Sequence, residues 1–240
     1  MRPLSPRILA GATLVLGVAL LGGCVPQAAT TEGTQVLGLY NVFLIAAAAV
    51  FVLVAGLIGW SVFRYRVGDD DDGQLPRQVK ANVRLELVWW ALPTILVIGL
   101  FILTAQVLSR EDARNPDPAV EVTVTGFQWQ WRFAYDGTDV AIQGTPDQPP
   151  ELWLPVGQPV ALTLVSPDVI HSFWVPDFLI KRDLIPGRTN RIDLTIEDAG
   201  TYAGQCAEFC GLLHDQMLFS IRAVSPSAFE AWLAGQDSGS

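Results

Sequence analysis

The chain is poor in charged side chains, and above all in positive ones. Only 16% of its 240 residues are charged, where soluble proteins average about 25%, and half of its residues are hydrophobic. It has 15 Lys and Arg against 24 Asp and Glu, a net charge of -9. Without a cationic surface a protein cannot displace the counterions of a phosphate backbone, so this composition argues against nucleic acid as a partner. It indicates an acidic protein that is partly embedded in a membrane.

The acidity belongs to the C-terminal half. Residues 1–110 carry a net charge of +2, whereas residues 111–240 carry 7 basic and 18 acidic side chains, a net charge of -11. A domain with such a field attracts basic partners and speeds their encounter, most strongly at low salt.

Residues 1–23 have the parts of an export signal. Arg2 and Arg7 form a basic region, residues 8–21 are apolar, and the run LGG precedes Cys24. The LGGC ending resembles the bacterial lipobox, in which the cysteine is lipidated and becomes the mature N-terminus. A plain signal peptide or an N-terminal membrane helix is the alternative. Residues 24–38 are then the mature N-terminal segment.

Two apolar runs predict membrane spans. Residues 39–63 have no charged side chain, and residues 87–108 form a second run. About 20 helical residues span a bilayer core of roughly 30 Å, so each run is long enough to cross. Pro93 in the second run would break a helix in water but is tolerated in a membrane helix. We therefore predict a transmembrane helical hairpin over residues 39–109.

The loop between the spans, residues 64–84, is rich in positive charge. Its basic residues are Arg64, Arg66, Arg77, Lys80 and Arg84. Such a concentration places the loop in the cytoplasm, and neighbouring acidic residues count little against it. Both ends of the mature chain then face outward, which agrees with an outward lipidated Cys24.

From residue 110 to residue 240 short alternating segments are separated by Pro and Gly, as in an antiparallel sandwich or barrel. Seven or more strands in roughly 125 residues favour a Greek-key sandwich. Apolar residues fall on even positions at Val122 and Val124, but on odd positions from Phe127 to Phe133. A one-residue slip exchanges the two faces of a strand, so we expect a bulge near Gly126.

Sulfur and imidazole side chains gather in one segment, QCAEFCGLLHDQM. At intervals of four, four and three residues it contains Cys206, Cys210, His214 and Met217. His171 lies on an earlier segment, HSFWVP. Apart from Cys24 and the initiator Met1, these are all the cysteines, histidines and methionines of the chain. Chance dispersal does not produce such clustering.

Thiolate, thioether and imidazole together select soft or borderline metals, and Cys/His/Met sets bind copper in electron-transfer sites. Magnesium and calcium prefer oxygen ligands, and structural zinc rarely takes methionine. A disulfide between Cys206 and Cys210 is the alternative in an exported chain, but it leaves both histidines and Met217 unexplained. A mononuclear blue copper site uses one cysteine, so the second thiolate implies two metals.

These residues carry a resemblance to a known family. From about Leu39 to its end the chain resembles subunit II of a haem-copper cytochrome c oxidase, and QCAEFCGLLHDQM is similar to that family's binuclear copper A motif. Four other segments resemble family segments in the same order: ELVWWALP (86–93), GFQWQW (126–131), HSFWVP (171–176) and KRDLIPGR (181–188). The fold that the resemblance implies is an N-terminal transmembrane α-helical hairpin plus an all-β cupredoxin-like Greek-key sandwich.

By the same resemblance, the copper A ligands are His171, Cys206, Glu208, Cys210, His214 and Met217. The two cysteines bridge two copper ions, Met217 binds one copper, and the main-chain carbonyl of Glu208 binds the other. The Glu208 side chain is expected to reach a magnesium or manganese ion shared with subunit I.

Three further residues match family positions. Trp129 matches the tryptophan through which electrons from cytochrome c reach copper A, although by itself it could be an ordinary sandwich aromatic, and Trp131 is expected to be a packing residue. Glu86 matches the glutamate at the mouth of the K proton pathway, but an ionisable residue at a membrane boundary can also simply snorkel. Asp168 matches an acidic docking position for basic cytochrome c, although many acids of this domain could serve.

The sequence therefore predicts the electron-accepting subunit of a terminal cytochrome c oxidase. Electrons would pass from copper A to haem in subunit I, which reduces oxygen and translocates protons. The expected partners are subunits I and III, the membrane, and cytochrome c or another donor. That donor is a separate protein, since no CxxCH haem-attachment motif occurs. The expected location is the bacterial cytoplasmic membrane, multi-pass, with the copper domain on the periplasmic or extracellular side.

Two other functions are weighed against this prediction. A quinol oxidase subunit II can also carry a lipobox, but it lacks the metal ligands that are complete here. A copper-binding or copper-delivery membrane lipoprotein has no need for Glu86 or for KRDLIPGR. Both are therefore disfavoured.

Overall fold

The computed structural model describes residues 26–66, 78–145 and 147–237. They form two compact units. The helical unit is Thr34–Asp117, and the β unit combines the described residues up to Gly33 with those from Pro118 onward. The predicted signal, residues 1–23, and Cys24 lie outside the described residues, so the lipobox hypothesis stays a prediction.

The helical unit is built on two long helices, α2 (Thr31–Arg64) and α3 (Val83–Glu111). Each is long and apolar enough to cross a membrane, with a mean hydropathy of 2.8 in an 18-residue stretch of α2 and 2.2 in one of α3. Helix α3 continues through Pro93, as expected of a membrane helix. Within the described residues almost no side chain of either helix is buried, because their apolar surfaces face outward. The predicted pair of apolar helices is confirmed.

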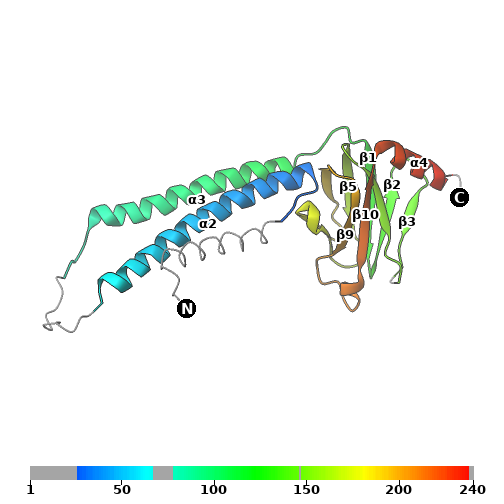
Figure 1. Ribbon diagram of the computed structural model, residues 1–240. Coiled ribbons are helices and arrows are strands. Elements are labelled where there is room, and N and C mark those ends of the chain that lie inside the picture. Colours follow the sequence, from blue (N-terminus) through cyan, green and yellow to red (C-terminus); the bar gives the residue numbers. More distant parts are fainter. Residues whose placement is uncertain (1–25, 67–77, 146, 238–240) are drawn as a thin grey trace, which may run out of the picture. The chain divides into compact units, whose positions relative to one another are not determined.

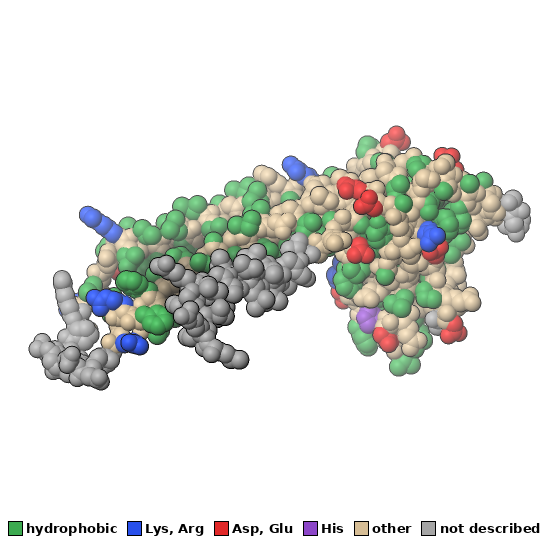
Figure 2. All heavy atoms as spheres, viewed as in Figure 1, with side chains coloured by type: hydrophobic (Ala, Val, Ile, Leu, Met, Phe, Trp, Pro, Cys, Tyr) green, Lys and Arg blue, Asp and Glu red, His purple; other side chains and the backbone are tan. Residues whose placement is uncertain are grey.

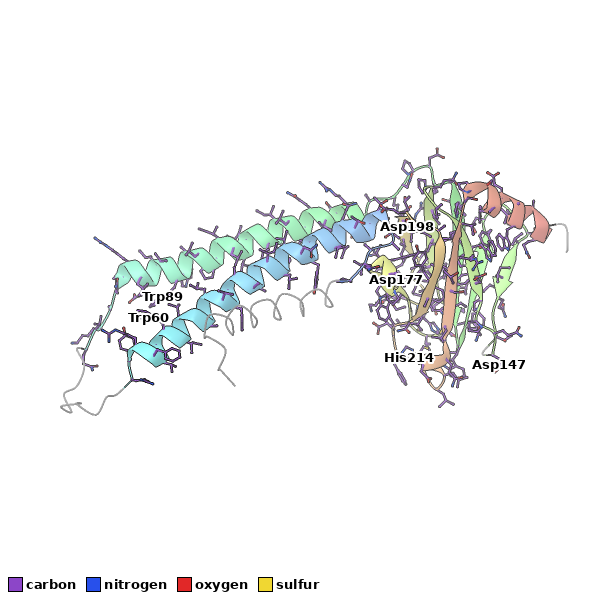
Figure 3. All side chains as sticks on the ribbon, in the orientation of Figure 1. Trp60, Trp89, Asp147, Asp177, Asp198 and His214 are labelled. Carbon is purple, nitrogen blue, oxygen red and sulfur yellow. The ribbon has the colours of Figure 1, made fainter. Side chains whose placement is uncertain are left out.

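Aromatic side chains mark one end of this helix pair. Trp60 lies near the end of α2 and Trp89 near the start of α3, on the side of the connecting loop (Figure 3). Trp is enriched where a membrane helix meets the headgroup region, since its ring is apolar and its N–H is polar. The position of these residues agrees with a boundary between membrane and water at this end.

The β unit is a sandwich of two five-stranded sheets (Figure 1). The first sheet contains, in spatial order, β3 (Ala141–Gln143), β2 (Gln130–Tyr135), β1 (Val120–Phe127), β5 (Pro159–Val165) and β8 (Asn190–Thr195). The second contains β4 (Glu151–Pro155), β10 (Leu218–Val224), β9 (Gly200–Cys206), β6 (His171–Val175) and β7 (Ile180–Leu184). Each sheet has one parallel pair, β1 with β5 and β10 with β4, because the chain crosses between the sheets. The predicted all-β sandwich is confirmed.

The core of the sandwich lies between the two sheets. Alternate residues of β1 and β5 point inward, and the burial of their apolar surface is the main stabilising contribution. Trp131 and Phe133 of β2 are fully buried and pack against Phe219 of β10, with ring centroids 5.1 and 5.8 Å away. Phe173 of β6 stacks on Phe219 at 4.6 Å. This aromatic layer packs beneath the metal ligands at one end of the sandwich.

The expected bulge near Gly126 is wrong. Strands β1 and β2 pair in an uninterrupted antiparallel register from Val122↔Tyr135 to Phe127↔Gln130. Each pair joins an even-numbered residue to an odd-numbered one, so inward residues are even in β1 and odd in β2. The change of parity in the sequence is therefore produced by a two-residue turn, Gln128 and Trp129, between two strands. A bulge and a short turn leave the same parity signal, and only the pairing separates them.

Strands β3 and β7 are not evident in the sequence. Both lie at the edge of their sheets, where one side has no neighbouring strand. The inward and outward positions of β3 are exposed or half-buried, and β7 carries the polar run Lys181–Asp183. Alternating hydrophobicity in a sequence indicates a strand with one buried face. Short edge strands with polar side chains lack this alternation, so the sequence does not predict them.

The surface of the β unit carries the acidic charge. Figure 2 shows Asp and Glu side chains scattered over the visible face of the sandwich, with fewer Lys and Arg among them. This distribution agrees with the net charge of the C-terminal half and with attraction of basic partners.

Candidate metal centre

The predicted ligands meet at one end of the sandwich. His171 is the first residue of β6 and Cys206 the last residue of β9. Between β9 and β10 a loop carries Cys210, His214 and Met217. The loop is closed at its base, because the N–H of Cys206 donates to the carbonyl of Met217 at 3.0 Å and that of Ala207 donates to Ser172 at 3.1 Å.

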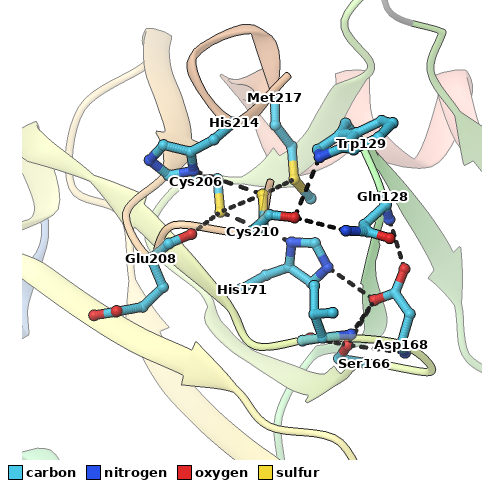
Figure 4. Close-up of polar contacts among 11 residues, drawn as sticks. Gln128, Trp129, Ser166, Asp168, His171, Cys206, Glu208, Cys210, His214 and Met217 are labelled. Atoms are coloured by element: carbon cyan, nitrogen blue, oxygen red, sulfur yellow. Dashed lines mark hydrogen bonds and ion pairs between the residues drawn. The ribbon is translucent and has the colours of Figure 1, made fainter. Parts of the chain in front are cut away.

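The donor atoms of this set lie close together (Figure 4). The two cysteine Sγ atoms are 3.9 Å apart. The Nδ1 atom of His171 lies 3.9 Å from the Cys206 Sγ, and that of His214 lies 3.6 Å from the Cys210 Sγ. The Met217 Sδ is 3.8 Å from the Cys210 Sγ, and the main-chain oxygen of Glu208 is 3.3 Å from the Cys206 Sγ. All six residues named by the family resemblance are therefore brought together.

This donor set fits a sulfur-rich metal centre. Sulfur and nitrogen ligands about 2.0–2.3 Å from one ion lie roughly 3.3–3.8 Å apart at tetrahedral angles, which matches the separations found. The cysteines are free, and their separation of 3.9 Å is far longer than a disulfide bond of about 2.05 Å. His171 and Met217 are fully buried, and both cysteines are more than nine-tenths buried. A cluster of two buried thiols, the buried His171 imidazole and the half-buried His214 imidazole suits copper better than a hard cation.

The two thiols are not equivalent in the absence of metal. Burial raises the pKa of Cys206, but its hydrogen bonds, first of all the one with His171, together outweigh burial and bring the pKa down to about 7. Burial and the neighbouring charge of Cys206 raise the pKa of Cys210 to about 12. The pair therefore holds one thiolate readily, and a second only when a metal displaces the remaining proton.

Asp168 contacts one of the ligands directly. Its Oδ1 lies 2.9 Å from the Nε2 of His171, whose Nδ1 faces the sulfurs. A carboxylate on the outer nitrogen fixes the tautomer and the ring orientation of a metal-binding histidine. The pKa of His171 is raised above its ordinary value, since the lowering effect of burial is outweighed by the hydrogen bonds with Cys206 and Asp168. The docking role predicted for Asp168 stays a prediction.

The turn between β1 and β2 touches the ligand loop. The indole N–H of Trp129 donates to the main-chain carbonyl of Cys210 at 3.2 Å, and the side-chain amide of Gln128 donates to the same carbonyl at 2.7 Å. The main-chain N–H of Gln128 donates to Asp168 Oδ2 at 2.7 Å. The contact of Gln128 is not predictable from the sequence, in which this residue carries no distinguishing signal.

Trp131 has more than a packing role. Its ring is fully buried 6.4 Å from that of His171, and its indole N–H donates to the carbonyl of Met217 at 3.2 Å. Gly126 lies beside both rings, and a Cβ there would come within 3.1 Å of the Trp131 ring and 3.3 Å of the His171 Cβ. The absence of a side chain at position 126 thus lets β1 pack against the ligand.

Glu208 and Lys181 form an ion pair beside the centre. The Lys181 Nζ is 2.7 Å from Glu208 Oε1 and 3.3 Å from Asp183 Oδ1. The hydrogen bond with Glu208 raises the pKa of Lys181, so the lysine stays protonated. In this structure the carboxylate expected to bind magnesium or manganese is neutralised by a lysine of the same chain.

Glu86 lies in the helical unit, in the first turn of α3. Its side chain accepts a hydrogen bond from the main-chain N–H of Asn82 at 3.1 Å, while Asn82 Oδ1 accepts one from Leu85 at 3.2 Å. These reciprocal bonds cap the start of the helix. A capping role does not test the predicted role in proton uptake.

Exposed apolar side chains surround the ligands. Among the described residues of the β unit, the large hydrophobic side chains that are exposed are Ile170, Phe209, Leu212 and Leu218. Each is next to a ligand or within the ligand loop, and Phe209 and Leu212 are 82% and 83% exposed. Clustered exposed apolar residues mark interaction sites. We call these four residues the apolar rim.

The fold and the site together define a membrane-anchored cupredoxin-like protein with a sulfur-rich, two-cysteine metal centre. Comparison with known proteins narrows this class. Residues 19–107 match the family model for the transmembrane domain of cytochrome c oxidase subunit II, and residues 147–224 match that for its periplasmic domain.

Curated relatives cover nearly the whole chain. A probable cytochrome c oxidase subunit 2 of Streptomyces coelicolor is 35% identical over 281 residues, covering 97% of this chain and 87% of the relative. Cytochrome c oxidase subunit 2 of Mycobacterium tuberculosis is 32% identical and covers 87% of this chain and 73% of its own length. Among solved structures, the periplasmic domain of subunit II of a Bradyrhizobium japonicum cytochrome oxidase shares 30% identity over 51% of this chain and 96% of its own, with a TM-score of 0.47.

The chain belongs to the cytochrome c oxidase subunit II family. It is therefore part of an oxidoreductase complex that carries a haem-copper centre, and family membership together with the buried His/Cys/Cys cluster supports a copper A site. It is a membrane protein whose β unit lies on the outer side.

Proposed function

We propose that this chain is the subunit through which electrons enter a terminal cytochrome c oxidase. The observation that carries this proposal is the assembly of six donors, two of them free thiols 3.9 Å apart, at one end of the sandwich. When bound, a copper pair supplies a one-electron carrier whose change of charge is shared by two metals. The buried aromatic layer and the closed base of the loop hold the donor side chains in place. The donors therefore need little rearrangement during electron transfer.

Within this proposal the ligands are His171, Cys206, Cys210, His214 and Met217, with the main-chain carbonyl of Glu208. The two thiols face one another at 3.9 Å and, as thiolates, would hold the two copper ions together with the other donors. The Glu208 oxygen lies on the Cys206 side of the pair and the Met217 sulfur on the Cys210 side, which supports their separate roles.

Trp129 is the proposed point at which electrons from the donor enter. Its ring is half-buried, and its indole N–H is one hydrogen bond from the main chain of a ligand residue. A donor that touches this ring is thus connected to Cys210 by a short path. The apolar rim lies around the same ligands, where the haem edge of a donor such as cytochrome c would approach.

Partners beyond the chain complete the proposed function. Subunit I would receive the electrons at haem, reduce oxygen and translocate protons, with subunit III beside it. Glu86 would stand at the entrance of a proton pathway, since it is an exposed carboxylate at the loop end of α3. The Glu208 carboxylate would bind magnesium or manganese shared with subunit I, in which case Lys181 gives up its ion pair.

A copper-delivery protein is less well supported. Delivery requires ligands that a partner can reach and exchange, whereas His171 and Met217 are fully buried and held by Asp168 and Trp131. A quinol oxidase subunit would not need the assembled ligand set.

The test is copper content and electron paramagnetic resonance of the full chain purified with its complex. Two copper ions per chain that share one unpaired electron, with a seven-line or broad unresolved hyperfine pattern, are expected. A single copper with a four-line blue-site signal, or cysteines that remain metal-free when copper is supplied under reducing conditions, would contradict the proposal.

A further inference from the structure

The turn residue Gln128 touches both chain segments that carry the centre. Its side-chain Nε2 donates to the Cys210 carbonyl at 2.7 Å, and its main-chain N–H donates to Asp168 Oδ2 at 2.7 Å. Asp168 Oδ1 in turn lies 2.9 Å from His171 Nε2. One residue is thus connected to a bridging cysteine on one side and to a buried histidine on the other (Figure 4).

The Cys210 carbonyl is a shared acceptor. It takes one hydrogen bond from Gln128 and another from the Trp129 indole at 3.2 Å, which uses both lone pairs of the oxygen. The positions of the two donors are thereby tied to each other. A change at Gln128 is expected to alter the contact between Trp129 and the ligand loop.

The next residue of the loop shows how close this contact is. Gly211 has a φ of +124°, a backbone conformation that residues other than glycine rarely adopt. A Cβ at this position would lie 3.0 Å from the Trp129 Nε1 and 3.1 Å from the Gln128 Nε2. The turn and the loop therefore approach closely because position 211 has no side chain.

The ligand loop has little else to hold it on this side. Phe209 and Leu212, which flank Cys210 and Gly211, point into solvent and are more than four-fifths exposed. These two side chains do not anchor the main chain beside the buried Cys210, so the hydrogen bonds from the turn contribute to its position. The bond at 2.7 Å is the shorter of the two that it receives from the turn.

From this geometry we propose that Gln128 is a positioning residue for the metal centre. Its amide holds the Cys210 main chain, and hence the Cys210 thiol, in register with His171 and Trp129. The inference rests on the proposed copper pair. Partners that orient metal ligands typically change metal affinity or activity by 10- to 100-fold when they are removed.

The test compares Gln128→Glu and Gln128→Leu in the full chain with its complex. Both variants are close to glutamine in size, both lack the amide N–H donor, and both keep the main-chain bond to Asp168. Gln143→Glu, at an exposed position of the edge strand β3, is the matched control. We expect both Gln128 variants to bind two coppers with about 10-fold lower affinity in chelator competition, and to show a changed hyperfine pattern. The control should match the wild type.

Wild-type affinity and spectra in both Gln128 variants would overturn the inference. Failure of both variants to fold, seen by circular dichroism, would also overturn it, since the residue would then be structural rather than positioning. Neither result would affect the proposed function, which instead fails if the wild-type chain holds no copper pair. The two ideas are therefore tested separately.

Discussion

The two ends of the β sandwich are stabilised by different kinds of contact. At the metal end buried polar ligands are held by hydrogen bonds, and the apolar rim is left exposed. At the other end α4 (Pro226–Asp237) covers the sandwich with aromatic rings. Trp232 of this helix stacks on Trp153 of β4 at 5.1 Å and meets the Tyr135 ring at 5.2 Å.

This difference indicates that one end of the strands serves stability and the other serves metal binding. β2 and β10 both start at the metal end and finish at the α4 end, so the same strands serve both purposes. Apolar packing at the α4 end serves stability, whereas at the metal end the apolar rim stays exposed beside the ligands, where it can contact partners. Substitutions at the two ends should therefore separate stability from metal binding.

The largest expected effect is that of Cys210→Ser. A serine hydroxyl is a poor ligand for copper compared with a thiolate. Only one thiolate then remains, so the pair of thiolates that the proposed two-copper site requires is lost. We expect loss of the shared-electron signal and loss of cytochrome c oxidation by the complex. Copper analysis and electron paramagnetic resonance measure the first, and oxygen uptake the second. An unchanged signal would be evidence against the copper ligand set.

Trp232→Ala tests the opposite end. Truncating a fully buried aromatic residue costs about 3–5 kcal/mol, and a half-buried one should cost less, roughly 2–3 kcal/mol of unfolding free energy. Denaturant unfolding followed by circular dichroism measures this loss, and the copper signal should stay as in the wild type. Phe209→Ala is the matched control, because an exposed ring at the metal end should change stability by less than about 0.5 kcal/mol. Equal losses in the two variants would remove the contrast between the ends.

Asp168→Asn is expected to weaken copper binding by about 10-fold, because the amide holds His171 less firmly than the carboxylate does. Stability should change little, as the Asp168 side chain is about one-third exposed. Chelator competition measures the affinity. An unchanged affinity with slower reduction by cytochrome c would instead favour the docking role of Asp168.

The smallest effect is an alkaline loss of stability from the α4 end. Burial raises the pKa of Tyr135 well above its ordinary value near 10, and its hydroxyl bonds both the N–H and the carbonyl of Trp153 at 2.9 Å. The unfolded chain loses this proton near pH 10, whereas the folded chain retains it. This contribution to stability is therefore fully present below pH 10 and is lost as the pH rises above it.

The measurement for this prediction is the unfolding free energy between pH 8 and pH 11. Tyr135→Phe should lower stability at pH 8 and show a shallower decline above pH 10 than the wild type. Some decline should remain, because burial also raises the pKa of Tyr202. Identical slopes in both proteins would show that Tyr135 does not titrate on unfolding.

Much of the fold and of the ligand set could be predicted from residue types and their spacing. Long charge-free runs define membrane helices because hydrocarbon admits few charges, and this holds whatever the neighbours are. Cys206, Cys210, His214 and Met217 are close in sequence and share a loop, so local spacing already brings them together. The arrival of His171 in that cluster follows from the family resemblance rather than from spacing.

The register of β1 and β2 and the short edge strands could not be predicted. A change from even-numbered to odd-numbered apolar residues indicates that the inward positions shift. It does not indicate whether a bulge or a turn shifts them. The same limit applies to the contacts of Gln128 and Asp168. Gln128 bonds residues 40 and 82 positions away, and nothing in its neighbourhood marks it for that purpose.

The sequence by itself determined that the chain is anchored in a membrane, that its outer half is acidic, and that its clustered sulfur and imidazole donors suit a soft metal. These properties follow from residue type and local spacing, which do not depend on how distant segments meet. Only the tertiary structure decided that Gln128 donates to Asp168, that Gln128 and Trp129 share the Cys210 carbonyl, and that Lys181 neutralises Glu208. Gln128 and Trp129 lie 82 and 81 residues before Cys210, and Lys181 lies 27 residues before Glu208, so only the folded arrangement of the strands and loops brings these groups together.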